Sequence, residues 1–161
     1  MPQTSTCLWF DRQAQDAADY YVSLFPNSRI VATTHYTAGA AMPEGSVLTV
    51  SFELDGRLYT GLNGGPHFTL SPAVSLVVHC RDQDEIDRYW KALSAEPAAE
   101  QCGWVRDRFG VSWQVVPEQL FEMLQHRDPQ RRKRVMDAVM GMKKIDLREL
   151  QDVFEFERSP S

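Results

Sequence analysis

The polar side chains with the most chemical potential lie in two segments whose residues alternate as in β-strands. His79 shares a strand face with Ser75 and Val77, and its imidazole could bind a metal or act as a general base, because its free pKa is near neutrality. The alternative is a hydrogen-bonded strand histidine without a chemical role. Gln114 lies on the face opposite Trp113, and a buried amide there would need a partner or a ligand. These residues predict a neutral, hydrogen-bonding cleft.

The segment that must position Gln114 is 102–117, which predicts a β-hairpin whose turn ends at Gly110. Trp104 follows a glycine in the first arm, and it could wall a ligand pocket or pack in the core. Trp113 lies on the opposite face of the second arm, where we expect a covering helix.

The order strand, helix, strands occurs twice along the chain, and a shift of 69 positions lays Ser75 on Thr6. We therefore predict an α+β fold in which two βαβββ modules form a curved mixed sheet with a cleft, with added C-terminal helices. The expected boundaries are a single domain 1–161, a first module of about 4–63, a second of about 74–117 and a helical extension 118–157. Hydrophobic periodicity and turn residues predict strands over 4–10, 29–36, 46–54, 57–63 and 74–80, and helices over 13–25, 84–93, 118–125, 129–142 and 147–154. The connection 95–100 has no clear pattern beyond an optional short strand.

Composition narrows the classes of function. The 161 residues suffice for one hydrophobic core, and a net charge of -5 disfavours a general nucleic-acid binder. The basic stretch 127–134 fits a solvated helix face. No apolar run is long enough to span a membrane. Three cysteines without CxxC spacing predict reduced thiols in a cytoplasmic protein, with Cys7 and Cys80 on the helix-covered face.

Four stretches together resemble a known family: CLWFDRQAQDAADYYVSLFPNS, GLNGGPHF, SLVVHCRDQDEIDRYWKALS and GWVRDRFGVSWQVVP. They are similar to the PhnB-like branch of the glyoxalase/bleomycin-resistance/dioxygenase proteins, the vicinal oxygen chelate superfamily. Members of this branch often carry the name 3-demethylubiquinone 3-methyltransferase. The resemblance covers roughly 4–150, and it implies the two-module fold and a homodimer.

The resemblance also implies where a metal would bind, because many members of the superfamily hold a divalent cation with His, Glu or Gln from four strands. The matching positions here are Thr6, Tyr59, Ser75 and Gln114, and the register at Tyr59 is left open. None of these side chains is a carboxylate or an imidazole, so the set would hold a cation weakly. We therefore expect no metal cofactor. The alternative is a divalent metal bound by an unconventional set that includes His79.

The function predicted from the sequence is metal-free binding of a small molecule, and whether the protein is an enzyme is left open. The alternative is a metal-dependent lyase, isomerase or dioxygenase, and a third possibility is a structural dimer with a filled cleft. Methyl transfer lacks support, because the clustered glycines precede Pro66 instead of a helix that could hold a methyl donor. The residues expected to line the cleft are Thr6, Thr49, Ser51, Tyr59, Asn63, Ser75, His79, Trp104 and Gln114.

Overall fold

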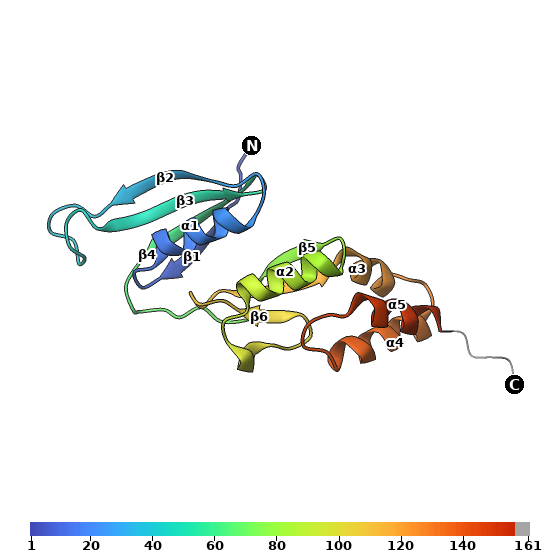
Figure 1. Ribbon diagram of the computed structural model, residues 1–161. Helices are drawn as coiled ribbons and strands as arrows, with labels where there is room; N and C mark the ends of the chain where they lie inside the picture. The colour runs from blue at the N-terminus through green and yellow to red at the C-terminus, as the bar shows by residue number, and fades with distance from the viewer. Residues whose placement is uncertain (157–161) are drawn as a thin grey trace, which may run out of the picture. The chain divides into compact units, whose positions relative to one another are not determined.

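The computed structural model describes residues 1–156, and the chain divides into two compact units, Met1–Ser71 and Pro72–Ser161 (Figure 1). The fold class is α+β, as predicted. Each unit is built on its own small sheet, which combines parallel and antiparallel strand pairs. Among the described residues, no helix has the length and apolar character that a membrane span requires.

The first unit contains a complete βαβββ module. Its elements are β1 (Thr6–Phe10), α1 (Ala14–Leu24), β2 (Arg29–His35), β3 (Val47–Leu54) and β4 (Arg57–Asn63). The strand order is β1-β4-β3-β2, with β1 parallel to β4 and the other pairs antiparallel. The turn between β3 and β4 has positive φ at both Asp55 and Gly56, which is the geometry that an Asp-Gly hairpin favours.

Helix α1 packs on one face of this sheet through small side chains (Figure 1). A Cβ added to Gly61 of β4 would lie 3.1 Å from the Cβ of Ala14, so the glycine permits the close approach of helix and strand. The core beneath the helix is fully or nearly fully buried, and its main members are Leu8, Phe10, Tyr21, Val50 and Phe52.

Trp9 lies on the opposite face of β1 and packs against the chain that follows β4. Its indole Nε1 donates a hydrogen bond to the carbonyl of Gly65 at 2.9 Å, and its ring meets Phe68 edge-on at 4.9 Å between centroids. A Cβ at Gly64 would lie 2.2 Å from the indole ring. Gly64 is therefore required by the close approach of Trp9, which gives the Gly-Gly pair a structural role.

The second unit repeats the plan with one strand fewer. Its elements are β5 (Leu76–Cys80), α2 (Gln83–Leu93), the 3-10 helix η1 (Pro97–Ala99), β6 (Trp104–Arg106), β7 (Ser112–Pro117), α3 (Glu118–Leu124), α4 (Pro129–Met140) and α5 (Leu147–Glu155). The strand order is β5-β7-β6, with β5 parallel to β7 and β6 antiparallel to β7. The prediction of a second full βαβββ module was therefore wrong in one element. The 3-10 helix occupies the connection 95–100, and Pro97 has no backbone N–H to donate to a sheet.

The three C-terminal helices belong to the core of the second unit, and α4 and α5 lie side by side (Figure 1). Apolar side chains of these helices and of the connection between α4 and α5 form a buried cluster with Val116 of β7, which contains Leu120, Met123, Val135, Val139, Met142, Ile145 and Leu150. The backbone N–H groups of Cys102 and Gly103 donate to the carbonyls of Met142 and Lys143, each at 2.8 Å. Residue 157, the predicted end of this helical extension, lies outside the described residues.

A buried carboxylate fixes the hairpin between β6 and β7. Asp107 is only 4% exposed. Its Oδ1 accepts hydrogen bonds from the backbone N–H groups of Phe109 and Val111 at 2.9 and 3.0 Å. Its Oδ2 accepts from the indole Nε1 of Trp113 at 2.8 Å. The aspartate therefore holds the turn and the following strand in one geometry, which sets the direction of every side chain in β7.

Candidate functional site

The face of the second sheet that points away from α2 carries most of the predicted site residues of this unit. Gln114 is the register neighbour of both Val77 on β5 and Trp104 on β6, so the three side chains share a face. Trp113 and Val115 lie on the other face, where they are buried beneath α2. The predicted opposite faces of Gln114 and Trp113 are therefore confirmed, and the register adds Trp104 to the face of Gln114.

Gln114 and Ser75 form a pair on this face. The Gln114 Nε2 donates a hydrogen bond to the Ser75 Oγ at 3.0 Å, and both residues are half-buried. Ser75 lies directly before β5, so the strand holds it beside β7. The pair is uncharged, and the amide carbonyl of Gln114 can accept a hydrogen bond from a ligand while the Ser75 hydroxyl can donate one.

A pocket of about 380 Å³ lies beside Trp104 in the second unit. Its principal lining residues are Pro72, Gln101, Cys102, Trp104, Arg106 and Met140. Ser112 also lines the pocket and, like Arg106, falls on the same sheet face as Gln114. Trp104, for which a pocket wall and core packing were both left open, borders this cavity, and ligand binding there stays a prediction.

Arg106 is the one charged side chain among the residues that line the pocket. Its Nη1 forms an ion pair with the Glu96 Oε2 at 3.0 Å. Its Nε is buried and has no hydrogen-bond partner within residues 1–156. A buried donor without an acceptor is uncommon, so this atom marks a place where an acceptor is missing.

His79 lies on the same face but packs against a C-terminal helix. It is the register neighbour of Val116, and its ring lies 5.1 Å from that of Phe121 on α3. The side chain is exposed, and it does not line the pocket.

In the first unit, three predicted residues lie on the face that α1 covers. They are Thr6, Tyr59 and Asn63. Tyr59 is the register neighbour of Thr6 and of the buried Phe52, and its ring stacks on the Phe52 ring at 5.5 Å between centroids. The expectation that Thr6 faces away from the helix was therefore wrong. Asn63 is 4% exposed, and its side chain serves the fold.

The side chain of Asn63 joins strand β4 to the start of α1. Its Oδ1 accepts from the backbone N–H of Ala14 at 2.9 Å, and its Nδ2 donates to the carbonyl of Val47 at 3.1 Å. Gln13, the N-cap residue of α1, makes no capping hydrogen bond with its own side chain. Asn63 thus supplies the cap from a distant strand.

The face opposite α1 carries the other two predicted residues. Thr49 and Ser51 of β3 lie there, and Ser51 is the register neighbour of Thr60 on β4. Thr60 in turn neighbours Cys7 on β1. The hydroxyls of Thr49 and Thr34 are hydrogen-bonded to each other. The strand register that was left open is thus resolved, and Thr60, not Tyr59, occupies the outer face.

An alignment error of one position explains why Thr6 was assigned to the wrong face of the first sheet. When Thr6 is laid on Leu76, the buried positions of β1 and β5 coincide: Leu8 falls on Val78 and Phe10 on Cys80. The sequence alignment had instead laid Thr6 on Ser75. A shift of one residue moves every side chain of a strand to the opposite face. Cys7 is accordingly exposed, which corrects the prediction that a helix covers it.

The three cysteines are free thiols in different environments. Cys80 is fully buried, and burial, with smaller contributions from the Glu85 and Asp82 carboxylates, raises its pKa to about 12. The folded protein therefore keeps this thiol protonated, whereas the unfolded chain ionises it near its ordinary pKa of 9.0. Cys80 thus favours the folded state below pH 9, and this contribution is lost as the pH rises from 9 towards 12.

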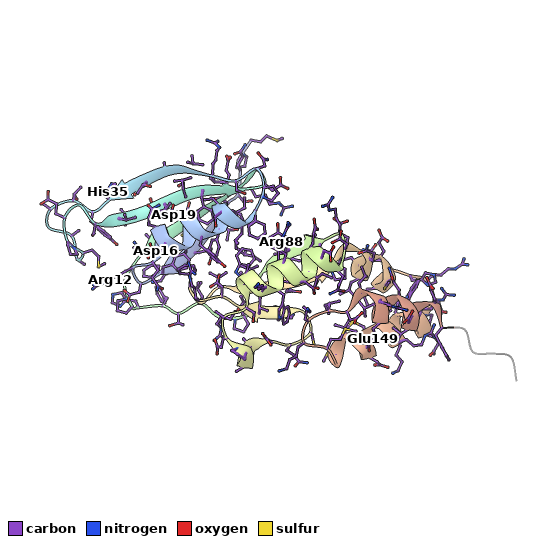
Figure 2. All side chains as sticks on the ribbon, viewed as in Figure 1. Arg12, Asp16, Asp19, His35, Arg88 and Glu149 are labelled. Atoms are coloured by element: carbon purple, nitrogen blue, oxygen red, sulfur yellow. The ribbon has the colours of Figure 1, made fainter. Side chains whose placement is uncertain are left out.

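The remaining histidines join no cluster with other candidate ligands. Within residues 1–156, no group of three or more His, Cys, Asp or Glu side chains could hold a metal ion. His35 is exposed at the end of the outer strand β2 (Figure 2), and the His126 ring meets the Phe154 ring edge-on at 5.2 Å.

The cationic side chains of the basic stretch 127–134 make contacts within the second unit. Arg132 donates to the carbonyl of His126 at 2.7 Å, and Arg134 donates to the carbonyl of Val153 at 2.8 Å. Lys133 pairs with Asp137 at 2.6 Å. These contacts give the cations a structural role within the helices.

Sequence reasoning missed most of the pocket. Alternation along the second arm places Ser112 on the face of Gln114, and the hairpin register adds Trp104 and Arg106 to that face, so Ser112 and Arg106 were within reach of the same argument. Met140 comes from a helix far along the chain, and no local pattern joins it to β6.

Comparisons with known proteins agree with this architecture. A family model described as 3-demethylubiquinone-9 3-methyltransferase matches residues 2–116, which end before α3. The PhnB protein of Bacillus cereus, provisionally named as such a methyltransferase, is 31% identical, with a TM-score of 0.61 over 72% of this chain and 99% of its own.

Protein PA1353 of Pseudomonas aeruginosa shares the fold at 18% identity, with a TM-score of 0.56 over 73% of this chain and 98% of its own. None of the curated proteins compared with the chain matches it. The family match spans more than half of the sequence, and the PhnB structure is covered almost completely. The chain therefore belongs to the PhnB-like family whose members carry the name 3-demethylubiquinone-9 3-methyltransferase.

Proposed function

We propose that the second unit binds a small, largely apolar molecule in the pocket beside Trp104, without a bound metal. The observation that supports this is a cavity of about 380 Å³ that combines an aromatic wall with a few polar side chains. Pockets for small molecules are commonly of roughly 300–1,000 Å³ and have this mixture of surfaces. Trp104 offers the flat apolar surface, and Gln101, Arg106 and Ser112 offer hydrogen-bonding groups.

The Gln114–Ser75 pair extends the proposed site along the sheet. Because Gln114 is the register neighbour of Trp104, a ligand that reaches beyond the pocket meets this uncharged pair next. Thr49 and Ser51 of the first unit, and His79 of the second, stay predictions for ligand contact. We do not include Thr6, Tyr59 and Asn63 in the proposed site, because they face or support α1.

The family name refers to methyl transfer, which we do not propose for this chain. Methyl donors of the S-adenosylmethionine type are commonly held by a glycine-rich loop between a strand and a helix. In the first unit Gly64 and Gly65 follow β4, and Gly64 accommodates the Trp9 ring. The loops that lead into α1 and α2 contain no glycine.

A second candidate function is that of a metal-dependent lyase, isomerase or dioxygenase that uses His79 and Gln114. We place it second because a divalent cation prefers charged or imidazole ligands, and the Gln114–Ser75 pair is uncharged. Elemental analysis of the purified protein separates the two proposals. Zinc, nickel, manganese or iron at one equivalent per chain would overturn the metal-free proposal.

The pocket proposal predicts that Trp104→Ala weakens the binding of an apolar aromatic probe, 2-ethylnaphthalene, about tenfold, because stacking and burial on the indole are lost. Ligand-observed NMR titration measures the affinity. Phe68→Ala is the matched control, because Phe68 is an exposed aromatic side chain of the first unit. Equal losses in both variants, or no binding to the unmodified protein, would contradict the proposal.

We also propose that the protein acts as a homodimer in the cytoplasm, where its three free thiols stay reduced. Apolar side chains that are 37% and 41% exposed, Phe121 and Met136, support an interface on the C-terminal helices. Light scattering after size-exclusion chromatography is expected to give the mass of two chains, and Met136→Lys is expected to give that of one. A single-chain mass for the unmodified protein would contradict this.

A further inference from the structure

Two sulfur atoms from distant parts of the chain meet on the wall of the pocket in the second unit. The Sγ of Cys102, in the connection before β6, lies 3.9 Å from the Sδ of Met140 at the end of α4. Both residues line the pocket. Cys102 is a free, half-buried thiol, and Met140 is 60% exposed. An ion that approaches from solvent can therefore reach a thiol and a thioether at one place.

Hydrogen bonds hold the two sulfur-bearing residues together. The backbone N–H of Cys102 donates to the carbonyl of Met142, shortly after α4, at 2.8 Å. The side chain of Gln101 adds a second link, because its Nε2 donates to the Cys102 Sγ at 3.2 Å and to the Met140 carbonyl at 3.1 Å. Hydrogen bonds of this kind orient a metal ligand and tune its affinity. The pair is thus positioned without a bound ion.

The distance between the sulfurs fits coordination of both to one ion. Metal–sulfur bonds in proteins are about 2.3 Å long. Two sulfurs that lie 3.9 Å apart can therefore share an ion with a sulfur–metal–sulfur angle of roughly 120°. This angle is that of trigonal coordination, so water or a small ligand can take the remaining position.

The types of donor select the class of ion. Thiolate and thioether sulfurs are soft ligands that favour Cu(I) over hard cations. A structural zinc ion needs further Cys, His or carboxylate ligands, and residues 1–156 contain no group of three such side chains that could hold a metal. A monovalent cation forms a neutral complex with one thiolate, which avoids the cost of placing a net charge in a half-buried site.

We infer that Cys102 and Met140 form a binding site for a soft monovalent cation of the Cu(I) type. On binding, the S–H bond breaks, the metal–sulfur bond forms and the proton passes to solvent, with no change of oxidation state. The inference goes beyond the proposed function and does not depend on it, because an apolar molecule needs no metal to bind in the pocket. Met140 lies beyond residues 2–116, which the family model matches, so the site is not part of that model.

The test uses Ag(I), a redox-stable soft cation, and protein with isotope-labelled methionine methyl groups in a Cys7→Ser background. This background leaves Cys102 as the accessible thiol, because Cys7 is replaced and Cys80 is fully buried. One equivalent of Ag(I) is expected to bind and to shift the methyl resonance of Met140 more than that of any other methionine. An unshifted Met140 resonance, or displacement of Ag(I) by an equal concentration of zinc, would overturn the inference.

Two variants in the same background separate a two-sulfur site from a thiol that binds alone. Met140→Leu keeps an apolar side chain of similar size and is expected to weaken Ag(I) binding about tenfold in a chelator competition. Met136→Leu, at another exposed position of α4, is the matched control and is expected to leave the affinity unchanged. Equal affinities in these two variants would overturn the two-sulfur site. Titration of 2-ethylnaphthalene into the same proteins reports the small-molecule site separately, so failure of one proposal is distinguishable from failure of the other.

Discussion

Asp107→Ala is expected to lower the free energy of unfolding of the second unit by about 4 kcal/mol, because three hydrogen bonds to a buried carboxylate are lost together. Two of the donors are backbone N–H groups of the turn, and the third is the buried indole of Trp113. Without the carboxylate, all three donors lose their acceptor at once. Urea unfolding followed by tryptophan fluorescence measures the change, and hydrogen exchange locates it in the hairpin.

Two further variants make this prediction specific. Asp107→Asn retains one oxygen that can accept from Phe109 and Val111, but its NH₂ group cannot accept from Trp113, so we expect about half of the loss. Asp152→Ala removes an exposed carboxylate of α5 and is expected to change stability by less than about 0.5 kcal/mol. A similar loss in Asp107→Ala and Asp152→Ala would show that the hairpin does not depend on this network.

The second sheet shows where alternation along the sequence was sufficient. The hairpin has strong turn residues and an extended strand with large apolar side chains at every second position. The hydrogen bonds of Asp107 to Val111 and Trp113 hold that strand in the register that the turn sets. The turn residues and the alternation agree, so the opposite faces of Trp113 and Gln114 could be predicted from local information alone.

The first sheet shows where the same method failed. The face of Thr6 was inferred from the alignment of two distantly similar halves and from the family resemblance, and an alignment error of one position inverts a strand. The face is instead fixed by packing between distant residues. Gly61 allows α1 to approach β4, and the Trp9 ring requires Gly64, so the two sides of the sheet are set by contacts that periodicity does not contain.

The pocket could not be predicted from the sequence, because its walls come from segments far apart along the chain. Its walls combine β6, the connection before it and Met140 at the end of α4. The sequence predicted the C-terminal helices but gave no docking site for them. The backbone hydrogen bonds of Cys102 and Gly103 to residues that follow α4 determine that position.

Asn63→Leu is expected to lower the free energy of unfolding of the first unit by about 3 kcal/mol, although Asn63 was predicted to contact a ligand. The leucine has a similar volume but leaves the N–H of Ala14 and the carbonyl of Val47 without their partners. Gln13 provides no side-chain cap, so the first turn of α1 loses its support as well. Urea unfolding monitored through Trp9, the tryptophan of the first unit, measures this loss.

Thr60→Val is the matched control, because Thr60 lies on the same strand but faces away from α1 and is replaced by a side chain of nearly equal shape. We expect it to change stability by less than about 0.5 kcal/mol. The two variants also distinguish a structural role from a ligand contact. A ligand-contact residue on the outer face would lower ligand affinity when it is replaced, without a loss of stability. If Asn63→Leu left stability unchanged but removed ligand binding, Asn63 would be a contact residue and not the remote cap of α1.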